Sequence, residues 1–549
     1  MNCHFSDMRK NMSLRRDIFC ICLTVAWCLG RYMEECSSLT CKVLVLLTVV
    51  SVIIGWLLSQ AAGMAYLLLK KVYGISSEVL TKVRTSEVLF RGKGFSDKIW
   101  FIMETLFLIA AWFPVFLAYY PGIFAYDVLA QMYQRLYGYS THHPLIHTLL
   151  LGWFYDMGGK LGNVNYGIAL YSLFQMLALA LAVSYMMYFL RRQKMPVVFR
   201  AAVLIFMGLM PVVSMLSISA TKDTLFSAFF LVVFTLLCEF CLEPESIRIP
   251  WKAVLFTACA VLACLFRNQG KYVLCVTLLL WLVLMPEKTK KRCAVIFALT
   301  ACIYLVSDAA LVTATDASAG SANEFCSVPY QQLARVYNYE KDDLDAQTTA
   351  YLEEIMPHIA TYELYKADHA KNDATGLEEP SKFFKTWLSL GTKYPLRYLE
   401  AFLYNTFDYW YPDGNSCASV YGYGLEDRQG YLLTDTKSGF GVEHTSLFPK
   451  LEALYERLFS ANEYQNIPVV SKVFHLSLYI WLPVGIAVAF VGKAGIRKQA
   501  APVVMLAAFV GTLLLGPCAL PRYILPVMLC IPAFYAFMKR SAGKGRAAG

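Results

Sequence analysis

The chain has 549 residues, of which 58% are hydrophobic and only 16% are charged. A soluble domain of this size carries roughly a quarter charged residues, and the apolar excess extends over most of the length, which excludes a soluble enzyme with a single anchor. The formal net charge of +10 does not indicate nucleic-acid binding, because the basic residues lie in short runs between apolar segments, as in proteins oriented by a membrane.

The apolar runs are long enough to cross a bilayer, for which a helix needs about 20 residues. They predict an all-α polytopic membrane protein with about twelve transmembrane helices, since only helices or closed barrels satisfy backbone groups in lipid and barrel strands are less apolar. The predicted spans cover residues 17–33, 43–69, 99–119, 164–190, 197–217, 222–241, 251–267, 270–285, 293–313, 471–491, 500–516 and 519–538.

Lysine and arginine residues in the short loops predict the orientation of these spans. If every basic cluster is cytoplasmic, the spans alternate without conflict and both termini lie in the cytoplasm. The N-terminal cluster resembles that of a signal peptide, but no small-residue cleavage site follows Arg31, so we expect an uncleaved first helix. The clusters lie at residues 9–16, 70–98, 191–194, 288–292, 493–498 and 539–546.

Two long segments then fall on the non-cytoplasmic side. Residues 120–163 contain an apolar stretch at 145–154 that is too short to span and is interpreted as an interfacial helix. Residues 314–470 are more hydrophilic, and their length predicts an extracytoplasmic domain. Apolar residues at helical spacing predict that this domain is mainly helical. The resulting regions are 1–98 (N-terminal helices and a basic loop), 99–313 (membrane core), 314–470 (extracytoplasmic domain) and 471–549 (C-terminal helices and a basic tail).

The positions of the cysteines leave room for a disulfide only in the extracytoplasmic domain. Many of the 17 cysteines lie in apolar runs, where a thiol behaves as a small hydrophobe. Cys326 and Cys417 share the hydrophilic segment and are the pair that could form a disulfide there.

Polar residues that interrupt the apolar pattern fall at the predicted non-cytoplasmic ends of the spans. Charged groups at membrane depth are costly and usually functional, so their convergence on one face predicts a single site. The candidate residues are Asp127, His142, His143, Lys222, Asp223, Arg267, Asn268, Arg522 and Tyr523.

These residue types suit sugar transfer from a lipid-linked donor. Transfer to a hydroxyl needs a carboxylate to take the acceptor proton, which Asp127 can supply. A polyprenyl-phosphate leaving group needs cations that receive the developing charge, and a guanidinium can bind two of its oxygens. The cations available are Lys222, Arg267 and Arg522.

Each of these charged residues also has a structural interpretation. Asp127 could cap the interfacial helix, since Asp is a favoured N-cap residue. Lys222 and Asp223 could form a local pair at a helix start. Arg267 and Arg522 could extend to lipid phosphates at the interface.

Two further groups have open roles. His142 and His143 could hold a proton, a phosphate or a divalent metal, or form an ordinary turn before Pro144; a divalent metal is therefore the candidate cofactor. An aromatic cluster in the hydrophilic segment could bind the acceptor sugar or form loop core. The cluster consists of Tyr409, Trp410 and Tyr411.

The long first outer loop with an early Asp, the many spans and the late Arg-Tyr pair resemble the GT-C superfamily of membrane glycosyltransferases, which includes protein O-mannosyltransferases and the aminoarabinose transferase of lipid A. The likeness is greatest to an uncharacterised bacterial multi-pass family. The resemblance implies a GT-C fold, an inverting transferase and Asp127 as its catalytic base. Val128 stands where many relatives have a second acid, so an Asp-x-Asp metal motif is missing here. The likeness is carried by residues 120–127, 219–223, 327–336 and 520–523.

We therefore expect a cell-membrane enzyme that moves a sugar from a polyprenyl-phosphate donor to an envelope glycan, lipid or protein, with its site outside the cytoplasm. The partners are the donor, the acceptor and membrane lipids, without nucleic acid. The alternative is a transporter or flippase of a glycolipid or envelope precursor. Transporters usually place charges near the midplane and show repeats, and neither feature is evident. A scaffold that displays the 314–470 domain is a third reading.

Overall fold

The computed structural model describes residues 2–36, 38–75, 96–415, 431–437, 439–492 and 496–546. Within these ranges the chain is helical, and its β pairing is limited to isolated bridges. The all-α prediction is confirmed for this part of the chain. Cys326 is buried with a free thiol, whereas Cys417 lies outside the described residues.

In the described part of the chain, six helices are long and apolar enough to cross a membrane, which indicates a membrane-embedded protein. A bent pair, in which α8 (Val197–Leu209) and α9 (Pro211–Ile218) meet at 51°, counts as a seventh if it forms one span. Pro211 has no backbone N–H to continue α8, which explains the break. The six are α2 (Cys41–Ile75), α4 (Asp97–Ala118), α7 (Val164–Arg192), α10 (Lys222–Leu242), α13 (Glu287–Thr315) and α23 (Pro521–Arg546).

The remaining predicted spans also fall on helices, most of them shorter. Among the described residues, three apolar helices have 10 to 17 residues, so length does not qualify them as spans on their own. Length and composition thus support six or seven crossings. The higher number of about twelve stays a prediction. These other helices are α1 (Asn2–Glu35), α11 (Pro250–Phe266), α12 (Asn268–Leu284), α21 (Leu478–Phe490) and α22 (Ile496–Leu514).

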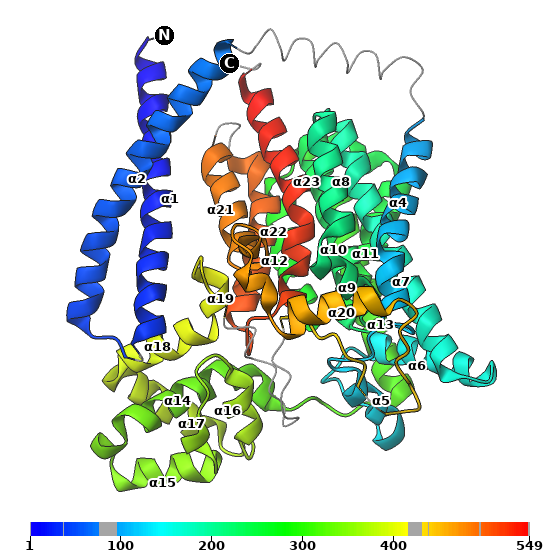
Figure 1. Cartoon of the computed structure of the whole chain (residues 1–549), viewed down its shortest axis with the longest axis vertical. Coiled ribbons are helices and arrows are strands. Elements are labelled where there is room, and N and C mark those ends of the chain that lie inside the picture. Colours follow the sequence, from blue (N-terminus) through cyan, green and yellow to red (C-terminus); the bar gives the residue numbers. More distant parts are fainter. Residues whose placement is uncertain are drawn as a thin grey trace.

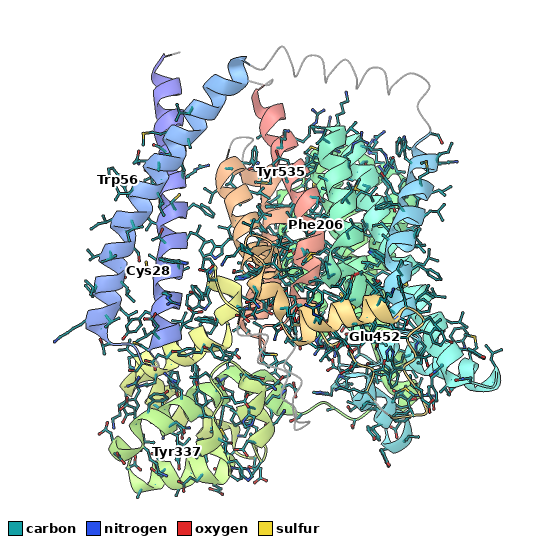
Figure 2. All side chains as sticks on the ribbon, viewed as in Figure 1. Cys28, Trp56, Phe206, Tyr337, Glu452 and Tyr535 are labelled. Atoms are coloured by element: carbon teal, nitrogen blue, oxygen red, sulfur yellow. The ribbon has the colours of Figure 1, made fainter. Side chains whose placement is uncertain are left out.

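The bundle is arranged around α10, in which 89% of the residues in the most apolar stretch are buried. In contrast, α2 and α13 are peripheral, with 11% buried, and large apolar side chains such as Trp56 project from α2 (Figure 2). An exposed apolar surface of this extent suits contact with lipid. Both termini lie at one end of the bundle, and α5 (Val128–Tyr137) and α6 (Leu145–Lys160) lie at the other (Figure 1). The short helix predicted at 145–154 corresponds to α6.

The described part of the hydrophilic segment is mainly helical, as predicted, but its residues are divided among separate hydrophobic cores. Residues from Cys326 to Tyr398 form a core of their own, to which Tyr337 belongs (Figure 2). Residues 431–474 pack instead into the main core of the bundle. We call residues 322–405 the helical subdomain; the domain boundary at 314–470 itself stays a prediction. Its helices are α14 (Ser327–Glu340), α15 (Ala346–Ile355), α16 (Ala367–Asp373), α17 (Pro380–Lys393) and α18 (Pro395–Asn405); α19 (Phe407–Trp410) and α20 (Pro449–Tyr455) follow.

Main-chain hydrogen bonds hold both the segment that leads into the helical subdomain and the subdomain itself against the rest of the protein. On one side, the amide of Thr141 donates to Ser318 O and the amide of Ser318 donates to Tyr139 O, both at 2.9 Å. On the other side, the amide of Ala367 donates to Pro517 O at 2.8 Å. The loop that carries His142 is therefore fixed to the segment before the subdomain, and the loop that precedes Arg522 is fixed to the subdomain.

Candidate functional site

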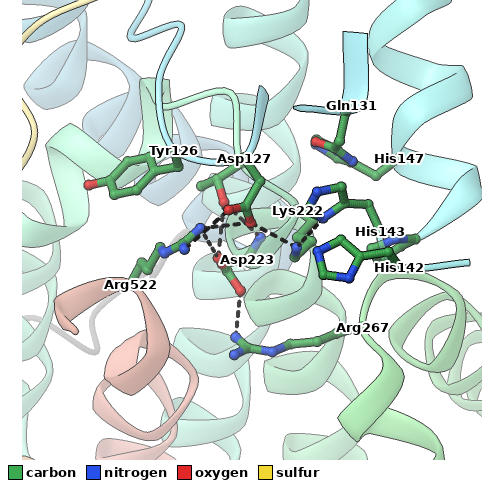
Figure 3. Close-up of polar contacts among 12 residues, drawn as sticks. Tyr126, Asp127, Gln131, His142, His143, His147, Lys222, Asp223, Arg267 and Arg522 are labelled. Carbon is green, nitrogen blue, oxygen red and sulfur yellow. Dashed lines mark hydrogen bonds and ion pairs between the residues drawn. The ribbon is translucent and has the colours of Figure 1, made fainter. Parts of the chain in front are cut away.

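Five charged side chains from four parts of the chain meet at the subdomain end of the bundle (Figure 3). The loop before α5 brings one carboxylate, the first turn of α10 brings a lysine and a second carboxylate, and two arginines come from the α11–α12 junction and the start of α23. These residues are Asp127, Lys222, Asp223, Arg267 and Arg522. The prediction that they form one group is therefore realised in space.

Cations and carboxylates alternate along this group. Lys222 Nζ donates to Asp127 Oδ2 at 2.8 Å, and Arg522 Nη1 donates to the same oxygen at 3.0 Å. Arg522 Nη1 also lies 3.4 Å from Asp223 Oδ2, and Arg267 Nη1 donates to Asp223 Oδ1 at 2.5 Å. Three cations thus face two carboxylates, which leaves one positive charge uncompensated within the five.

The backbone around Asp127 is held by the bundle. Ile123 exchanges hydrogen bonds with the end of α9, its amide donating to Ile218 O at 3.0 Å and its carbonyl accepting from Ala220 at 2.9 Å. These bonds bring the loop that carries Asp127 beside the start of α10. Tyr126 has a φ of +61°, a left-handed conformation that costs a bulky residue roughly 1–3 kcal/mol and is typical of functional sites.

The close approach of this loop to α7 requires glycine at position 122. Gly122 has a φ of +119°, and an added Cβ would lie 2.0 Å from Ser172 Oγ. Gly122→Ala is expected to lower the free energy of unfolding by about 1–3 kcal/mol through strain and overpacking, read as a lower melting temperature in detergent. Gly162→Ala is the matched control, because Gly162 has a φ of +92° with nothing within 4 Å of an added Cβ. Equal losses for both variants would attribute the whole effect to backbone conformation.

Asp127 occupies the N-cap position of α5, but its side chain makes no capping hydrogen bond. Its carboxylate turns instead to Lys222 and Arg522. Burial alone would raise the pKa of Asp127, but the charges of these two cations hold it well below its ordinary value. The side chain is 27% exposed, whereas that of Asp223 is fully buried. Asp127 is thus an ionised carboxylate that solvent can reach.

The arginines are held in place by aromatic rings and are not extended toward lipid. Arg522 lies 4.8 Å from the centroids of both the Tyr126 and Tyr523 rings, and Arg267 lies 4.7 Å from that of Tyr523. Both guanidinium groups are buried, which disfavours the interpretation that they reach for lipid phosphates. Cation–π contacts of this kind fix the plane of a guanidinium.

The two histidines have different environments. His143 is buried, and its Nδ1 accepts a hydrogen bond from Lys222 Nζ at 3.3 Å. Burial, together with the charge of Lys222, lowers the pKa of His143 to about 3, so the ring is neutral and serves as an acceptor. His142 is exposed, with its Nδ1 3.5 Å from Glu324 Oε1. Among the residues that the structure describes, no group of three or more His, Cys, Asp or Glu side chains is placed to hold a metal ion.

A cavity of about 330 Å³ opens beside this group. Of the described residues, six cationic side chains and three carboxylates line it, so its walls are positively charged overall. Asp127 lines the cavity, whereas Asp223 lies behind it. The lining cations are Lys222, Arg267, Lys366, Lys371, Lys437 and Arg522, and the lining acids are Asp127, Glu324 and Asp368.

The helical subdomain supplies a wall that sequence reasoning missed. Lys371 Nζ pairs with Glu324 at 3.0 Å and with Asp368 at 2.6 Å, so much of this wall is balanced in charge. Lys366 is a further cation there. Lys437, from the segment before α20, donates to Tyr126 O at 3.2 Å, and burial lowers its pKa.

Four predicted residues lie away from the cavity. Asn268 is exposed on α12, and its neighbour Gln269 lines the cavity instead. The aromatic cluster packs inside the protein: Tyr409 belongs to the main core, and Tyr411 and Trp410 pack against α1, where the Tyr411 hydroxyl donates to Glu34 at 2.9 Å. Tyr409 and Tyr411 are buried and Trp410 is half-buried, so the contacts of all three rings are packing contacts within the protein.

A comparison with known families finds a match over residues 137–548, to the family described as "Family of unknown function (DUF6020)". The matched region includes all the candidate site residues except Asp127. No curated protein and no solved structure matches the chain.

Proposed function

Because the chain belongs to DUF6020, a family of unknown function, we propose its function from the chemistry of its site: it is a membrane glycosyltransferase that uses a polyprenyl-phosphate-linked sugar. The observation that carries the proposal is a solvent-accessible carboxylate, Asp127, in a cation-rich cavity at one end of an apolar helical bundle. An amphiphilic donor fits this setting, since its lipid stays in the bilayer and its phosphate meets the cations. A GT-C-like fold, about twelve spans and a non-cytoplasmic site belong to the same proposal.

The site residues have different roles in a single displacement reaction. The acceptor hydroxyl attacks the anomeric carbon as Asp127 takes its proton. The bond from that carbon to the phosphate oxygen breaks, and polyprenyl phosphate leaves with the bonding electrons. Arg522, Lys222 and Arg267 receive the negative charge of the leaving group. Attack opposite the leaving group inverts the configuration of the sugar.

The function is tested with the purified full-length protein in vesicles, supplied with a panel of labelled polyprenyl-phosphate sugars and envelope acceptors. The expected result is loss of the lipid-linked sugar with formation of a glycosylated acceptor. Movement of an intact donor across the vesicle membrane, without bond cleavage, would contradict the proposal and identify a flippase.

The pH dependence of transfer gives a further prediction. Lys222→Met removes a cation that holds the pKa of Asp127 down, so this pKa should rise. Protonation of the base lowers the rate, and the pH dependence of kcat/KM reports the pKa of the free protein. The acidic limb of the kcat/KM profile should therefore move to higher pH, independently of the height of its plateau. Lys371→Met is the control, because Lys371 lines the same cavity but pairs with Glu324 and Asp368. An equal shift of the acidic limb in both variants would mean that this limb does not report the protonation of Asp127.

A further inference from the structure

The two carboxylates of the site differ in what a ligand could do to them. Asp223 is fully buried behind the cavity and is held by Arg267 and by the hydroxyl of Thr221 at 3.0 Å. Asp127 lines the cavity, and its contacts with Lys222 and Arg522 face it. A ligand that enters can therefore replace Asp127 without disturbing Asp223.

The cations keep other partners if Asp127 withdraws. Arg522 remains 3.4 Å from Asp223 and in contact with the rings of Tyr126 and Tyr523. Lys222 retains its contact with His143. An incoming anion thus meets donors that are already oriented, and the exchange replaces one anionic partner by another.

We propose that the carboxylate of Asp127 occupies the anion site of the ligand-free protein, and that a phosphate group displaces it from Arg522 and Lys222. The site itself is independent of the reaction; the identity of the phosphate as that of a lipid-linked donor rests on the proposed function. A phosphate oxygen accepts the same charge-assisted hydrogen bonds as a carboxylate oxygen and carries more charge.

Displacement has a chemical consequence for Asp127. A carboxylate that has lost two cationic partners and gained a phosphate as neighbour has a higher pKa. Asp127 therefore becomes a stronger base only when the anion is bound. A base strengthened by the donor couples proton removal to the presence of that donor.

The test measures binding to the purified full-length protein and does not need turnover. Farnesyl phosphate, inorganic phosphate and farnesol are titrated into wild type and into Asp127→Asn, which keeps the side-chain size but removes the competing charge. The variant is expected to bind farnesyl phosphate at least about tenfold more tightly, the scale of one charged hydrogen bond. Asp127→Ser is a second variant of the same position, and thermal unfolding checks that each protein is folded.

Asp368→Asn is the matched control. It removes a carboxylate from the same cavity, but Asp368 pairs with Lys371 and not with Arg522 or Lys222. If Asp127 is the internal anion, this change alters affinity by a much smaller factor. Equal tightening in both variants would reduce the effect to general charge in the cavity and overturn the proposal, as would unchanged or weaker binding in Asp127→Asn.

The three probes identify the source of the phosphate. A response with both farnesyl phosphate and inorganic phosphate assigns the site to the phosphate group alone, and a response with farnesyl phosphate only assigns it to a lipid-borne phosphate. Tightening with farnesol would overturn the proposal, because farnesol has no charge to compete with Asp127. Tighter phosphate binding in a protein that transfers no sugar would preserve the anion site and contradict the glycosyltransferase.

Discussion

Asp127→Asn should reduce the rate of sugar transfer by about 10²- to 10⁴-fold, the usual contribution of a general base. The amide has the size of the carboxylate but cannot take the acceptor proton. Initial rates of the wild type and the variant, measured in the same vesicles with a donor that the wild type uses, give the loss of transition-state stabilisation directly. The loss should appear in the maximal rate, because the variant is expected to bind the donor phosphate more tightly.

The control for this measurement is Asp156→Asn. Asp156 lies on α6 and forms an exposed pair with Arg135 at 2.6 Å, away from the cavity. Exposed pairs contribute about 0–1 kcal/mol, so this variant should transfer sugar at nearly the wild-type rate. Wild-type transfer by a folded Asp127→Asn protein would show that the base lies elsewhere.

Glu400→Gln should lower the free energy of unfolding by about 3–5 kcal/mol, the scale of breaking one side of a buried ion pair. The side chains of Arg335 and Glu400 are both fully buried, and Arg335 donates to Glu400 Oε2 at 2.9 and 3.0 Å. Glu400 also accepts from the amide of Leu39 at 2.5 Å. Without the carboxylate, the charge of Arg335 loses its main compensation, and the link between the helical subdomain and the α1–α2 connection weakens. Unfolding is followed by heating the protein in detergent.

Glu353→Gln is the comparison for this prediction. Glu353 pairs with Lys341 at 3.1 Å in the same subdomain, but its side chain is 47% exposed. Solvent screening limits such a pair to about 0–1 kcal/mol. A loss in Glu400→Gln no greater than that in Glu353→Gln would mean that the buried pair is not important for stability.

The helices and the charged group could be predicted because both depend on the cost of exposing polar groups to lipid. Backbone groups in an apolar run must bond within the run, which requires a helix. A charge at the end of such a run is costly wherever it lies, so Lys222, Asp223, Arg267 and Arg522 stand out against their neighbours. Asp127 is less obvious, since its sequence position equally suits an N-cap; the three-dimensional contacts distinguish the two roles.

The subdomain wall could not be predicted, because charge carries no information in a hydrophilic segment. Lys366 and Lys371 are unremarkable in sequence and become part of the cavity through contacts distant along the chain. One such contact comes from the 327–336 motif, where the Gln331 amide donates to Glu363 O at 2.8 Å and Leu364 O at 3.0 Å. That motif shapes the loop before Lys366.

Asn268 and the aromatic cluster lie away from the cavity for local reasons. Adjacent residues in a helix point about 100° apart, so a junction assigned one residue off selects Asn268 where Gln269 faces the cavity. The Tyr-Trp-Tyr-Pro-Asp-Gly composition indicates a loop but not what covers it. The covering surface includes α1, whose Glu34 precedes Tyr411 by 377 positions, a separation beyond local sequence patterns.

The main-chain attachments at the helical subdomain and at the segment that leads into it limit how the cavity can be filled. These hydrogen bonds join main-chain atoms at Thr141–Ser318 and Ala367–Pro517. Most side-chain substitutions should therefore leave them in place. Because both edges of the cavity are held by main-chain hydrogen bonds, its walls are expected to keep their separation when a ligand binds. Substrates then enter through the opening of the cavity. The conformational changes on binding are those of side chains such as Arg522 and Lys222.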